Sequence, residues 1–296
     1  MRFILLILFT LIFSDNQEFD SSRAYNYVLE QCSLGPRFPG SPGHKLCKDY
    51  LISELSNYSD KIIVDSHNII DPLTLEEVEI YNLFARLNPN LKNRILLLAH
   101  WDTRRFADKD LKEDNHKKPV LGANDGASGI AVILTLLSHI NIKNYGIDIL
   151  FADAEDMGNY GDAESWAIGS RLFSSKYPKP LPQFGICIDM VADKDLEFKV
   201  EQYSFKMAPQ LIQMIWNIGK SKNYKSFKFE MGSPIIDDHL SFSKETGVPS
   251  INIIDLDYEF WHTVHDTPEN ISSESLGVVG DVLLTFLVEM DKNYER

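Results

Sequence analysis

Three short segments of this chain carry side chains that could bind a divalent metal ion. The segments are LGANDGAS, FADAEDMG and WHTVHDT, which span residues 121–128, 151–158 and 261–267. They supply Asp125, Asp156 and His262, a ligand set that suits a hard-to-borderline ion such as zinc. Glu155 is adjacent in sequence to Asp156, so its carboxylate would lie beside the ion. A metal that polarises a carbonyl group, next to a carboxylate that moves protons, is a reaction centre.

Each of these residues also has an ordinary structural interpretation. Asp125 could cap the helix that follows its Gly-rich turn, because Asp is a favoured N-cap residue. Glu155 and Asp156 could be solvated loop acids, and a lone histidine is usually structural. Consecutive acids directly after a buried strand seldom serve packing, however, and His262 is not alone. The combination favours a metal centre, whereas we interpret the nearby His265 as structural.

Predicted strands and helices alternate along most of the chain. Apolar periodicity predicts helices over 19–33, 45–56, 126–140, 164–174, 207–221 and 273–290. Strands are predicted over 61–69, 79–87, 94–100, 148–155, 184–190 and 250–256. The wholly apolar run 94–100 is typical of a strand buried on both faces. We expect a three-layer α/β/α fold, in which a mostly parallel, mixed central sheet carries helices on both faces.

Polar residues follow the predicted strands at the ends where ligands bind in open α/β sheets. These residues are His100, Asp102, Asp153, Glu155, Asp156 and Asp189. We find no linker, repeat or low-complexity tract, so residues 19–296 are expected to form a single catalytic domain. The Gly/Pro-rich stretch 35–44 predicts turns. The charged insertion 107–121 is predicted to be a surface loop, and 228–237 could border the pocket.

Composition limits the classes of partner. The 296 residues are 44% hydrophobic and 24% charged, with a net charge of -14. A globular chain of this kind can bury a large core. The acidic balance argues against binding to nucleic acid or anionic membranes, because their phosphates need clustered Lys and Arg.

The first residues resemble an export signal. Arg2 precedes an apolar run, 3–13, that is too short to span a bilayer alone. We predict a signal peptide over 1–14 and an exported chain, periplasmic or secreted. An uncleaved membrane anchor and a buried N-terminal strand or helix are the alternatives.

Cysteines and glycosylation sequons add little about function. Cys32 and Cys47 could form a disulfide after export, whereas Cys187 is interpreted as a buried strand residue. The sequons at Asn57 and Asn270 matter only if the source glycosylates exported proteins.

Six motifs, in order, resemble those of the zinc-dependent glutaminyl cyclases (glutaminyl-peptide cyclotransferases). This family shares its fold with the co-catalytic zinc aminopeptidases. The motifs are AHWDTR, GANDGASG, DAED, ESWAIGSR, DDHLSF and WHTVHDT. Each is short, but six in the family order are specific, and the resemblance covers residues 20–292.

The resemblance implies one zinc ion per chain, bound by Asp125, Asp156 and His262. Animal members have two Glu residues in the acidic pair, so the shorter Asp156 resembles bacterial-type enzymes. The cysteine pair that the animal enzymes have near the site is absent here.

The resemblance also implies the catalytic and substrate-binding residues. Glu155 would be the proton shuttle, in a hydrogen-bonded network with Asp189 and Asp237. Trp261 would line the substrate pocket together with Trp166, although Trp166 is not at the spacing found in the animal enzymes. The implied substrates are peptides or proteins with N-terminal Gln, which are converted to pyroglutamate with release of ammonia. The implied oligomeric state is a monomer.

The main alternative is a zinc aminopeptidase of the same fold, which binds two metal ions and activates a water between them. Its five ligands would be His100, Asp125, Asp156, Asp189 and His262, and all five residue types are present.

Three features favour the cyclase. Trp261 precedes the histidine ligand, Asp237 stands where aminopeptidases commonly have Ser, and HWDTR followed by SWAIGSR resembles bacterial-type cyclases. A non-catalytic relative is a third possibility, but it would be expected to have lost Glu155 or a ligand.

Overall fold

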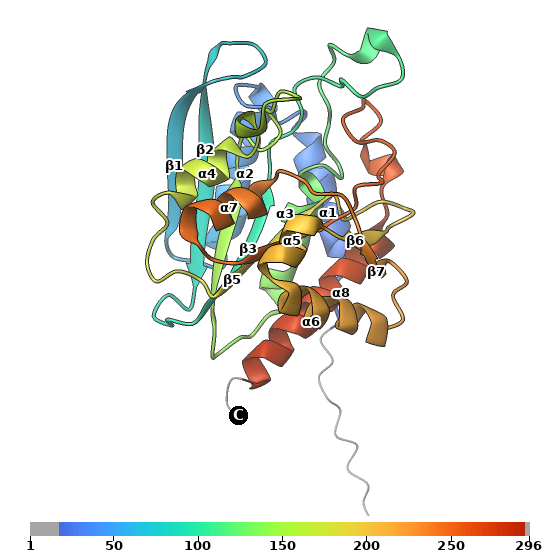
Figure 1. Cartoon of the computed structure of the whole chain (residues 1–296). Coiled ribbons are helices and arrows are strands. Elements are labelled where there is room, and N and C mark those ends of the chain that lie inside the picture. Colours follow the sequence, from blue (N-terminus) through green and yellow to red (C-terminus); the bar gives the residue numbers. More distant parts are fainter. Residues whose placement is uncertain (1–17, 294–296) are drawn as a thin grey trace, which may run out of the picture.

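A six-stranded sheet lies at the centre of the molecule in a computed structural model, which describes residues 18–293 (Figure 1). Its strand order is β1-β2-β4-β3-β5-β8. Strands β4, β3, β5 and β8 are parallel to one another, whereas β1 and β2 are antiparallel to their neighbours. The bounds are β1 Ile62–Ile70, β2 Glu77–Leu87, β3 Arg94–His100, β4 Gly146–Ala152, β5 Phe184–Asp189 and β8 Ser250–Ile254. The predicted mostly parallel, mixed sheet is confirmed.

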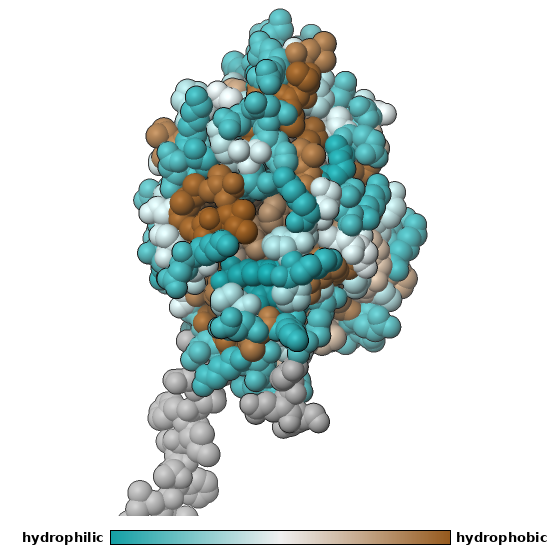
Figure 2. Space-filling model, turned by 90° about the vertical axis from the view of Figure 1, so that its left-hand side faces the viewer, coloured by the Kyte–Doolittle hydropathy of each residue, from teal (hydrophilic) through white to brown (hydrophobic). Residues whose placement is uncertain are grey.

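Burial along each strand follows its place in the sheet. Every residue of β3 and β4 is buried, because both strands are central and covered on both faces. The edge strand β1 instead alternates between partly buried and exposed residues. The side of the molecule that carries this edge is mainly hydrophilic and has separate hydrophobic patches (Figure 2).

Helices cover both faces of the sheet. On one face, α1 and α8 pack with α3, and α3 lies on β3 and β5. On the other face α4 packs on β2, and α7 packs on β3 and β5 beside α4. The bounds are α1 Ser21–Ser33, α2 Pro42–Ser56, α3 Ala127–His139, α4 Ile168–Ser174, α5 Gln202–Met207, α6 Pro209–Ser221, α7 Asp238–Thr246 and α8 Ser273–Asn293. The predicted three-layer α/β/α fold is therefore confirmed.

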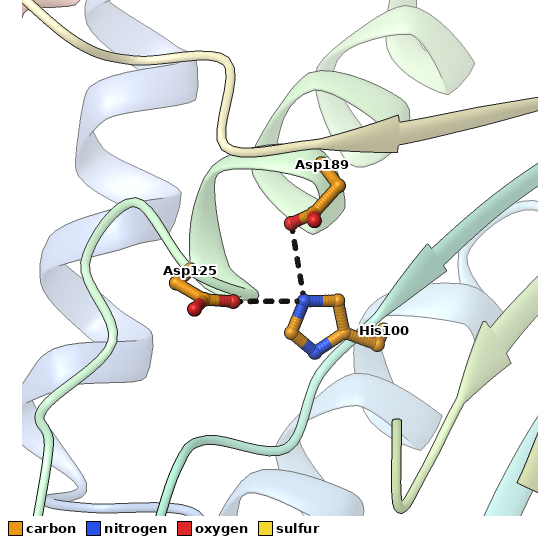
Figure 3. Close-up of side chains that lie close together, drawn as sticks. All are labelled: His100, Asp125 and Asp189. Atoms are coloured by element: carbon orange, nitrogen blue, oxygen red, sulfur yellow. Dashed lines mark hydrogen bonds and ion pairs between the residues drawn. The ribbon is translucent and has the colours of Figure 1, made fainter. Parts of the chain in front are cut away.

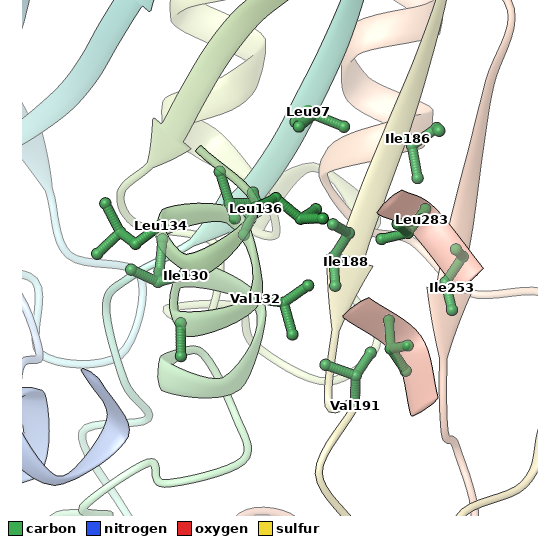
Figure 4. Close-up of a cluster of buried hydrophobic side chains, with 14 of the residues drawn as sticks. Leu97, Ile130, Val132, Leu134, Leu136, Ile186, Ile188, Val191, Ile253 and Leu283 are labelled. Atoms are coloured by element: carbon green, nitrogen blue, oxygen red, sulfur yellow. The ribbon is translucent and has the colours of Figure 1, made fainter. Parts of the chain in front are cut away.

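The larger hydrophobic core lies between the sheet and the layer of α3 and α8 (Figure 4). Leu97 of β3 and Ile188 of β5 face Val132 and Leu136 of α3 across this core. Gly129 allows the close approach of α3, because a Cβ atom there would lie 1.9 Å from the Ile188 carbonyl oxygen. This contact fixes the start of α3, and with it the preceding Asp125, beside the end of β5.

Some predicted boundaries are wrong for identifiable reasons. Helix α2 begins at Pro42 rather than near residue 45, because Ser41 caps it and proline is favoured in the first helical turn. The predicted helix 164–174 is interrupted at Ala167, whose φ of 49° is left-handed, and α4 starts only afterwards. The prediction of a helix over 207–221 begins two residues too early, because Met207 ends α5 and Pro209 opens α6.

Four elements are absent from the sequence-based prediction. They are β6 (Phe198–Val200), α5, β7 (Phe227–Met231) and α7. β6 and β7 form a separate two-stranded parallel sheet, whose strands of three and five residues are too short for clear alternation. Helix α7 is mostly polar but its first half is buried, so an apolar pattern could not reveal it.

The insertion 107–121 is only partly the solvated loop that its charge predicts. Leu111 is fully exposed, but Ala107, Asp110, Asn115 and Val120 are buried. Cys32, Cys47 and Cys187 are free thiols, so the considered disulfide between the first two is not formed. Between residues 18 and 293, no helix is long and apolar enough to cross a membrane. The predicted signal peptide, 1–14, lies outside the described residues.

Candidate metal centre

The predicted site residues lie together beyond the carboxyl ends of the parallel strands. His100 ends β3 and Asp189 ends β5, whereas Glu155 and Asp156 follow β4 after a short turn. Asp125 directly precedes the N-cap residue of α3, and His262 lies in the loop after β8. Because parallel strands end at one edge of the sheet, residues far apart in sequence converge there.

Asp125 lies between two histidines rather than capping α3. Its Oδ1 is 3.1 Å from His100 Nε2, and its Oδ2 is 3.4 Å from His262 Nε2. The N-cap residue of the helix is Gly126. His100 Nε2 also lies 3.1 Å from Asp189 Oδ1, so the three side chains converge on one point (Figure 3). The structure therefore favours the ligand interpretation of Asp125 over the cap.

Two groups of three ligand atoms meet at Asp125. One group is Asp125, Asp156 and His262, and the other is His100, Asp125 and Asp189. In the first group, His262 Nε2 lies 2.8 Å from Asp156 Oδ1. All five side chains are buried. The ligands assigned from the sequence, and the additional ones of the aminopeptidase alternative, are thus all within reach of an ion.

The first group fits zinc in donor type and in unsatisfied atoms. It offers one imidazole nitrogen and carboxylate oxygens, which are common zinc ligands. Asp156 Oδ2 is buried and receives no hydrogen bond from the described residues. An unpaired buried carboxylate oxygen is costly unless a cation meets it. Burial raises the pKa of Asp156 to about 6 despite the neighbouring His262. A bound divalent cation would lower that pKa by stabilising the charged form.

Glu155 lies beside this group as a nearly buried carboxyl with 7% of its surface exposed. Burial, and next the nearby Asp237 carboxylate, raise the pKa of Glu155 well above its usual value, although His100 opposes the shift. A carboxyl group tuned in this way can both accept and donate a proton near neutral pH.

The hydrogen-bonded network expected among Glu155, Asp189 and Asp237 stays a prediction, and the hydrogen bonds described for the two Asp side chains go to other groups. Asp189 pairs with His100, and Asp237 accepts hydrogen bonds from the Asn252 side chain and the Asp238 amide. The Cys187 thiol also donates to Asp237. The nearby Asp237 charge raises the pKa of Glu155. Burial raises the pKa of Asp189 to about 7.

Aromatic rings surround His262. The Trp166 ring stacks on the imidazole at a centroid distance of 6.2 Å and an angle of 8°. The Trp261 centroid is 4.1 Å from that of His262. The Tyr160 hydroxyl lies 2.7 Å from His262 Nδ1, and its ring packs against Trp166. Both predicted pocket tryptophans are thus at the centre, and Tyr160 joins them.

Sequence reasoning placed Asp102 at a strand end without a role and missed Asp266, and both residues hold the site loops. Asp102 accepts the backbone amides of Glu155 and Asp156, both at 3.1 Å, and so orients the acidic pair. Asp266 accepts the Asp125 amide at 3.1 Å and the Tyr258 hydroxyl at 2.9 Å. Asp102 and Asp266 lie inside the AHWDTR and WHTVHDT motifs, which was the available signal.

Arg104 and Tyr160 complete this supporting set. The buried Arg104 guanidinium donates to the carbonyl oxygens of Asp156 and Gly158, at 2.8 Å and 2.6 Å. Arg104 also lies in the AHWDTR motif, whereas Tyr160 lies outside every motif and gave no signal.

Backbone strain is concentrated at the same place. Four non-glycine residues at or beside the site have positive φ, namely Ala154, Ala167, Met190 and His262. Ala154 precedes Glu155, Ala167 follows Trp166, and Met190 follows Asp189. His262 is itself a candidate ligand. Such conformations cost energy and persist where the surrounding structure fixes them, commonly at functional sites.

Comparison with known proteins agrees with this geometry. The model of peptidase family M28 matches residues 82–287, a span that includes every proposed metal ligand. The chain belongs to peptidase family M28. The family match alone leaves the reaction open, because the site contains ligands for either one metal or two.

Relatives of this M28 member bear the names of both cyclases and peptidases. The glutaminyl cyclase of Bacteroides thetaiotaomicron is 35% identical, with a TM-score of 0.86 over 90% of this chain and 97% of that one. A Zn-dependent exopeptidase from Parabacteroides distasonis is 33% identical, with a TM-score of 0.87 over 91% and 98%. The glutaminyl-peptide cyclotransferase of Bos taurus is 21% identical over 288 residues, which cover 86% of this chain and 78% of that protein.

Proposed function

We propose that this chain is a glutaminyl-peptide cyclotransferase, which converts the N-terminal Gln of peptides or proteins to pyroglutamate and releases ammonia. The observation that carries the proposal is the set of aromatic rings around His262, one of the candidate ligands, beside a buried carboxyl group. Trp166, Trp261 and Tyr160 surround His262, and the buried Glu155 adjoins the ligand Asp156. Similarity to glutaminyl cyclases over most of the chain supports the proposal.

The aromatic residues would bind and orient the substrate. The γ-carboxamide of the N-terminal Gln is small and neutral, so it can lie among the rings of Trp166 and Trp261. The same rings would exclude bulk water, which would otherwise hydrolyse the amide. Holding the α-amine against the γ-carbonyl carbon within one molecule supplies much of the acceleration.

Zinc held by Asp125, Asp156 and His262 would polarise the γ-carbonyl group. In the reaction, the α-amine nitrogen forms a bond to the γ-carbonyl carbon, and the bond from that carbon to the amide nitrogen breaks. Glu155 would take a proton from the amine and deliver it to the departing nitrogen, so that ammonia leaves. Its raised pKa suits both transfers.

The supporting residues would keep this geometry fixed. Asp102 holds Glu155 and Asp156 through their amides, and Asp237 biases Glu155 toward the protonated form by charge repulsion. The Tyr160 hydroxyl fixes the ring orientation of His262 through Nδ1. Partners of this kind tune a metal ligand without touching the ion.

The second candidate is a zinc aminopeptidase with two metal ions. The observation in its favour is the second ligand group, His100, Asp125 and Asp189, which shares Asp125 with the first. A bridging carboxylate is suited to holding two ions and a water between them. The named neighbours include a Zn-dependent exopeptidase, so the family does not decide.

Product analysis separates the two candidates. Purified protein is incubated with a Gln-initiated dipeptide amide, with and without a chelator, and ammonia and peptide mass are followed. A cyclase releases ammonia in a chelator-sensitive way and leaves a peptide lighter by one ammonia. An aminopeptidase instead releases free glutamine, a result that would overturn the proposal.

A further inference from the structure

The insertion 107–121 is anchored directly to the loop that carries His262. The Lys109 amide donates to the His262 carbonyl oxygen at 3.1 Å. Asp110 Oδ2 accepts the Val264 amide at 3.2 Å, and Asp108 Oδ1 lies 3.6 Å from His262 Nδ1. Contacts on three successive residues fix this part of the insertion at the rim of the candidate metal centre.

The Lys109 side chain extends over the aromatic rings around His262. Its ammonium lies 4.1 Å from the Tyr160 ring centroid and 5.8 Å from that of Trp261. Within residues 18–293 the ammonium forms cation–π contacts and no ion pair. The side chain is exposed, so the charge remains available to a ligand.

Lys109 differs in this respect from the other cation at the site. The Arg104 guanidinium is buried, and its donors are taken by the Asp108 carboxylate and by backbone carbonyl groups. The surrounding side chains are otherwise rich in carboxylates. Lys109 therefore supplies an exposed positive charge without an ion-pair partner among the described residues, beside the Tyr160 and Trp261 rings.

We propose that Lys109 is a specificity residue, whose ammonium binds a carboxylate of the substrate just beyond the N-terminal Gln. This inference rests on the proposed cyclotransferase function. The proposed function places Trp261 at the substrate, and the Lys109 ammonium lies 5.8 Å from the centroid of that ring. A peptide that continues from an N-terminal Gln held beside Trp261 would therefore pass within reach of Lys109. The carboxylate could belong to an acidic second residue or to the C-terminus of a dipeptide.

Two matched substrate pairs distinguish these sources. Gln-Glu-amide against Gln-Gln-amide tests an acidic side chain, and Gln-Ala against Gln-Ala-amide tests a terminal carboxylate. Because the ion pair would be exposed, we expect the wild-type kcat/KM for the charged member of at least one pair to be higher by about twofold to fivefold. The preference should be carried mainly by KM and should weaken at high salt.

Substitutions then assign the preference to Lys109. Lys109→Met should abolish it, Lys109→Glu should reverse it, and Lys109→Arg should keep it. Lys117→Met removes the same charge from an exposed position of the same insertion and should keep the wild-type preference. Calorimetric binding of pyroGlu-Glu-amide and pyroGlu-Gln-amide gives a second readout, which should follow the same order.

The outcomes distinguish failure of the proposed function from failure of the role of Lys109. Wild-type protein that releases no ammonia from any of the four peptides would overturn the proposed function itself. Ammonia release from all of them, with preferences unchanged in Lys109→Met, would overturn only the role of Lys109. A preference for the charged member that disappears in Lys109→Met and persists in Lys117→Met would establish it.

Discussion

At the scale of single residues, the proposed reaction depends on Glu155 acting as an acid and a base beside the candidate ligand Asp156. Its position is set by the Asp102 carboxylate, which accepts the Glu155 amide, and its proton affinity is raised by burial and by Asp237. Neither the position of Glu155 nor its raised pKa requires its side chain to bind the metal. Its chemistry can therefore be removed without removing the metal.

Glu155→Gln should keep the fold and the zinc content but lower kcat for ammonia release by about 10²–10⁴-fold, because the proton shuttle is lost while the shape is kept. Steady-state kinetics and metal analysis on the same preparation check this. Glu164→Gln makes the same change at a side chain that is 76% exposed and should have wild-type activity. Full activity in Glu155→Gln would remove Glu155 from the mechanism.

No motif in the sequence indicates that Tyr160 belongs to the site. Its hydroxyl bonds to His262 Nδ1, the nitrogen that faces away from the ligand group. Tyr160→Phe should weaken zinc binding by about tenfold or more, because an outer partner that orients a histidine ligand is lost. Competition with a chelator of known affinity measures this.

Tyr203→Phe on α5 removes the same atom at a position outside the site and serves as the control. Equal zinc affinity in Tyr160→Phe and in wild-type protein would show that the hydroxyl does not tune the ligand.

At the scale of elements, the convergence of the candidate ligands could be predicted from the sequence better than the contacts that hold the site loops. Asp125, Asp156 and His262 lie in motifs beside strands whose apolar runs are unambiguous, so their convergence follows from a parallel sheet. The partners of Asp237 could not be foreseen. They depend on the short polar helix α7, which Asp237 caps, and on Asn252 of β8.

Glu201 shows how an element near the site is held. It caps α5, and its buried carboxylate accepts the Tyr203, Ser204 and Ile235 amides. Glu201 Oε2 also lies 3.2 Å from His239 Nε2 of α7. Burial by itself would raise the pKa of Glu201, but the bond and charge of His239, together with the amide bonds, lower it to about 2.

Glu201→Gln should therefore lower the free energy of unfolding at pH 7, by about 1–3 kcal/mol. Because the pKa of Glu201 is lower in the folded than in the unfolded state, the charged carboxylate stabilises the fold at pH values above its unfolded-state pKa. This stabilisation is lost as the pH falls toward 2. The gap between variant and wild type should thus narrow below about pH 4. Denaturation curves across this range measure it, with the exposed Glu230→Gln as control. A gap that stays constant down to pH 2 would contradict the assignment.

At the scale of the whole molecule, the candidate metal centre brings together segments that are far apart in sequence. The loop before α3, the turn after β4 and the loop after β8 each contribute one ligand of the first group. The layered architecture was predictable because strand and helix periodicities alternate. The tertiary contacts of the insertion 107–121 were not predictable, because its charged composition is also that of a solvated loop.

Zinc should stabilise the folded chain, because the three ligands converge only in that state. Zinc at a free concentration of 100 times its Kd should add about 2.7 kcal/mol to the free energy of unfolding. Thermal unfolding with zinc and with a chelator tests this, and the melting temperature should fall on chelation and recover on zinc addition. Asp125→Ala should lose most of the response. An equal response in Asp125→Ala and wild-type protein would contradict the ligand assignment.

The proposed enzyme is a cyclotransferase that works with one zinc ion. The most direct measurement titrates metal-free protein with zinc and follows ammonia release from a Gln-initiated dipeptide amide at each ratio. The rate should rise linearly and reach a plateau at one zinc per chain, and the product should be pyroglutamyl peptide without free glutamine. A rate that rises to a plateau at two zinc ions per chain, with free glutamine as the product, would contradict it.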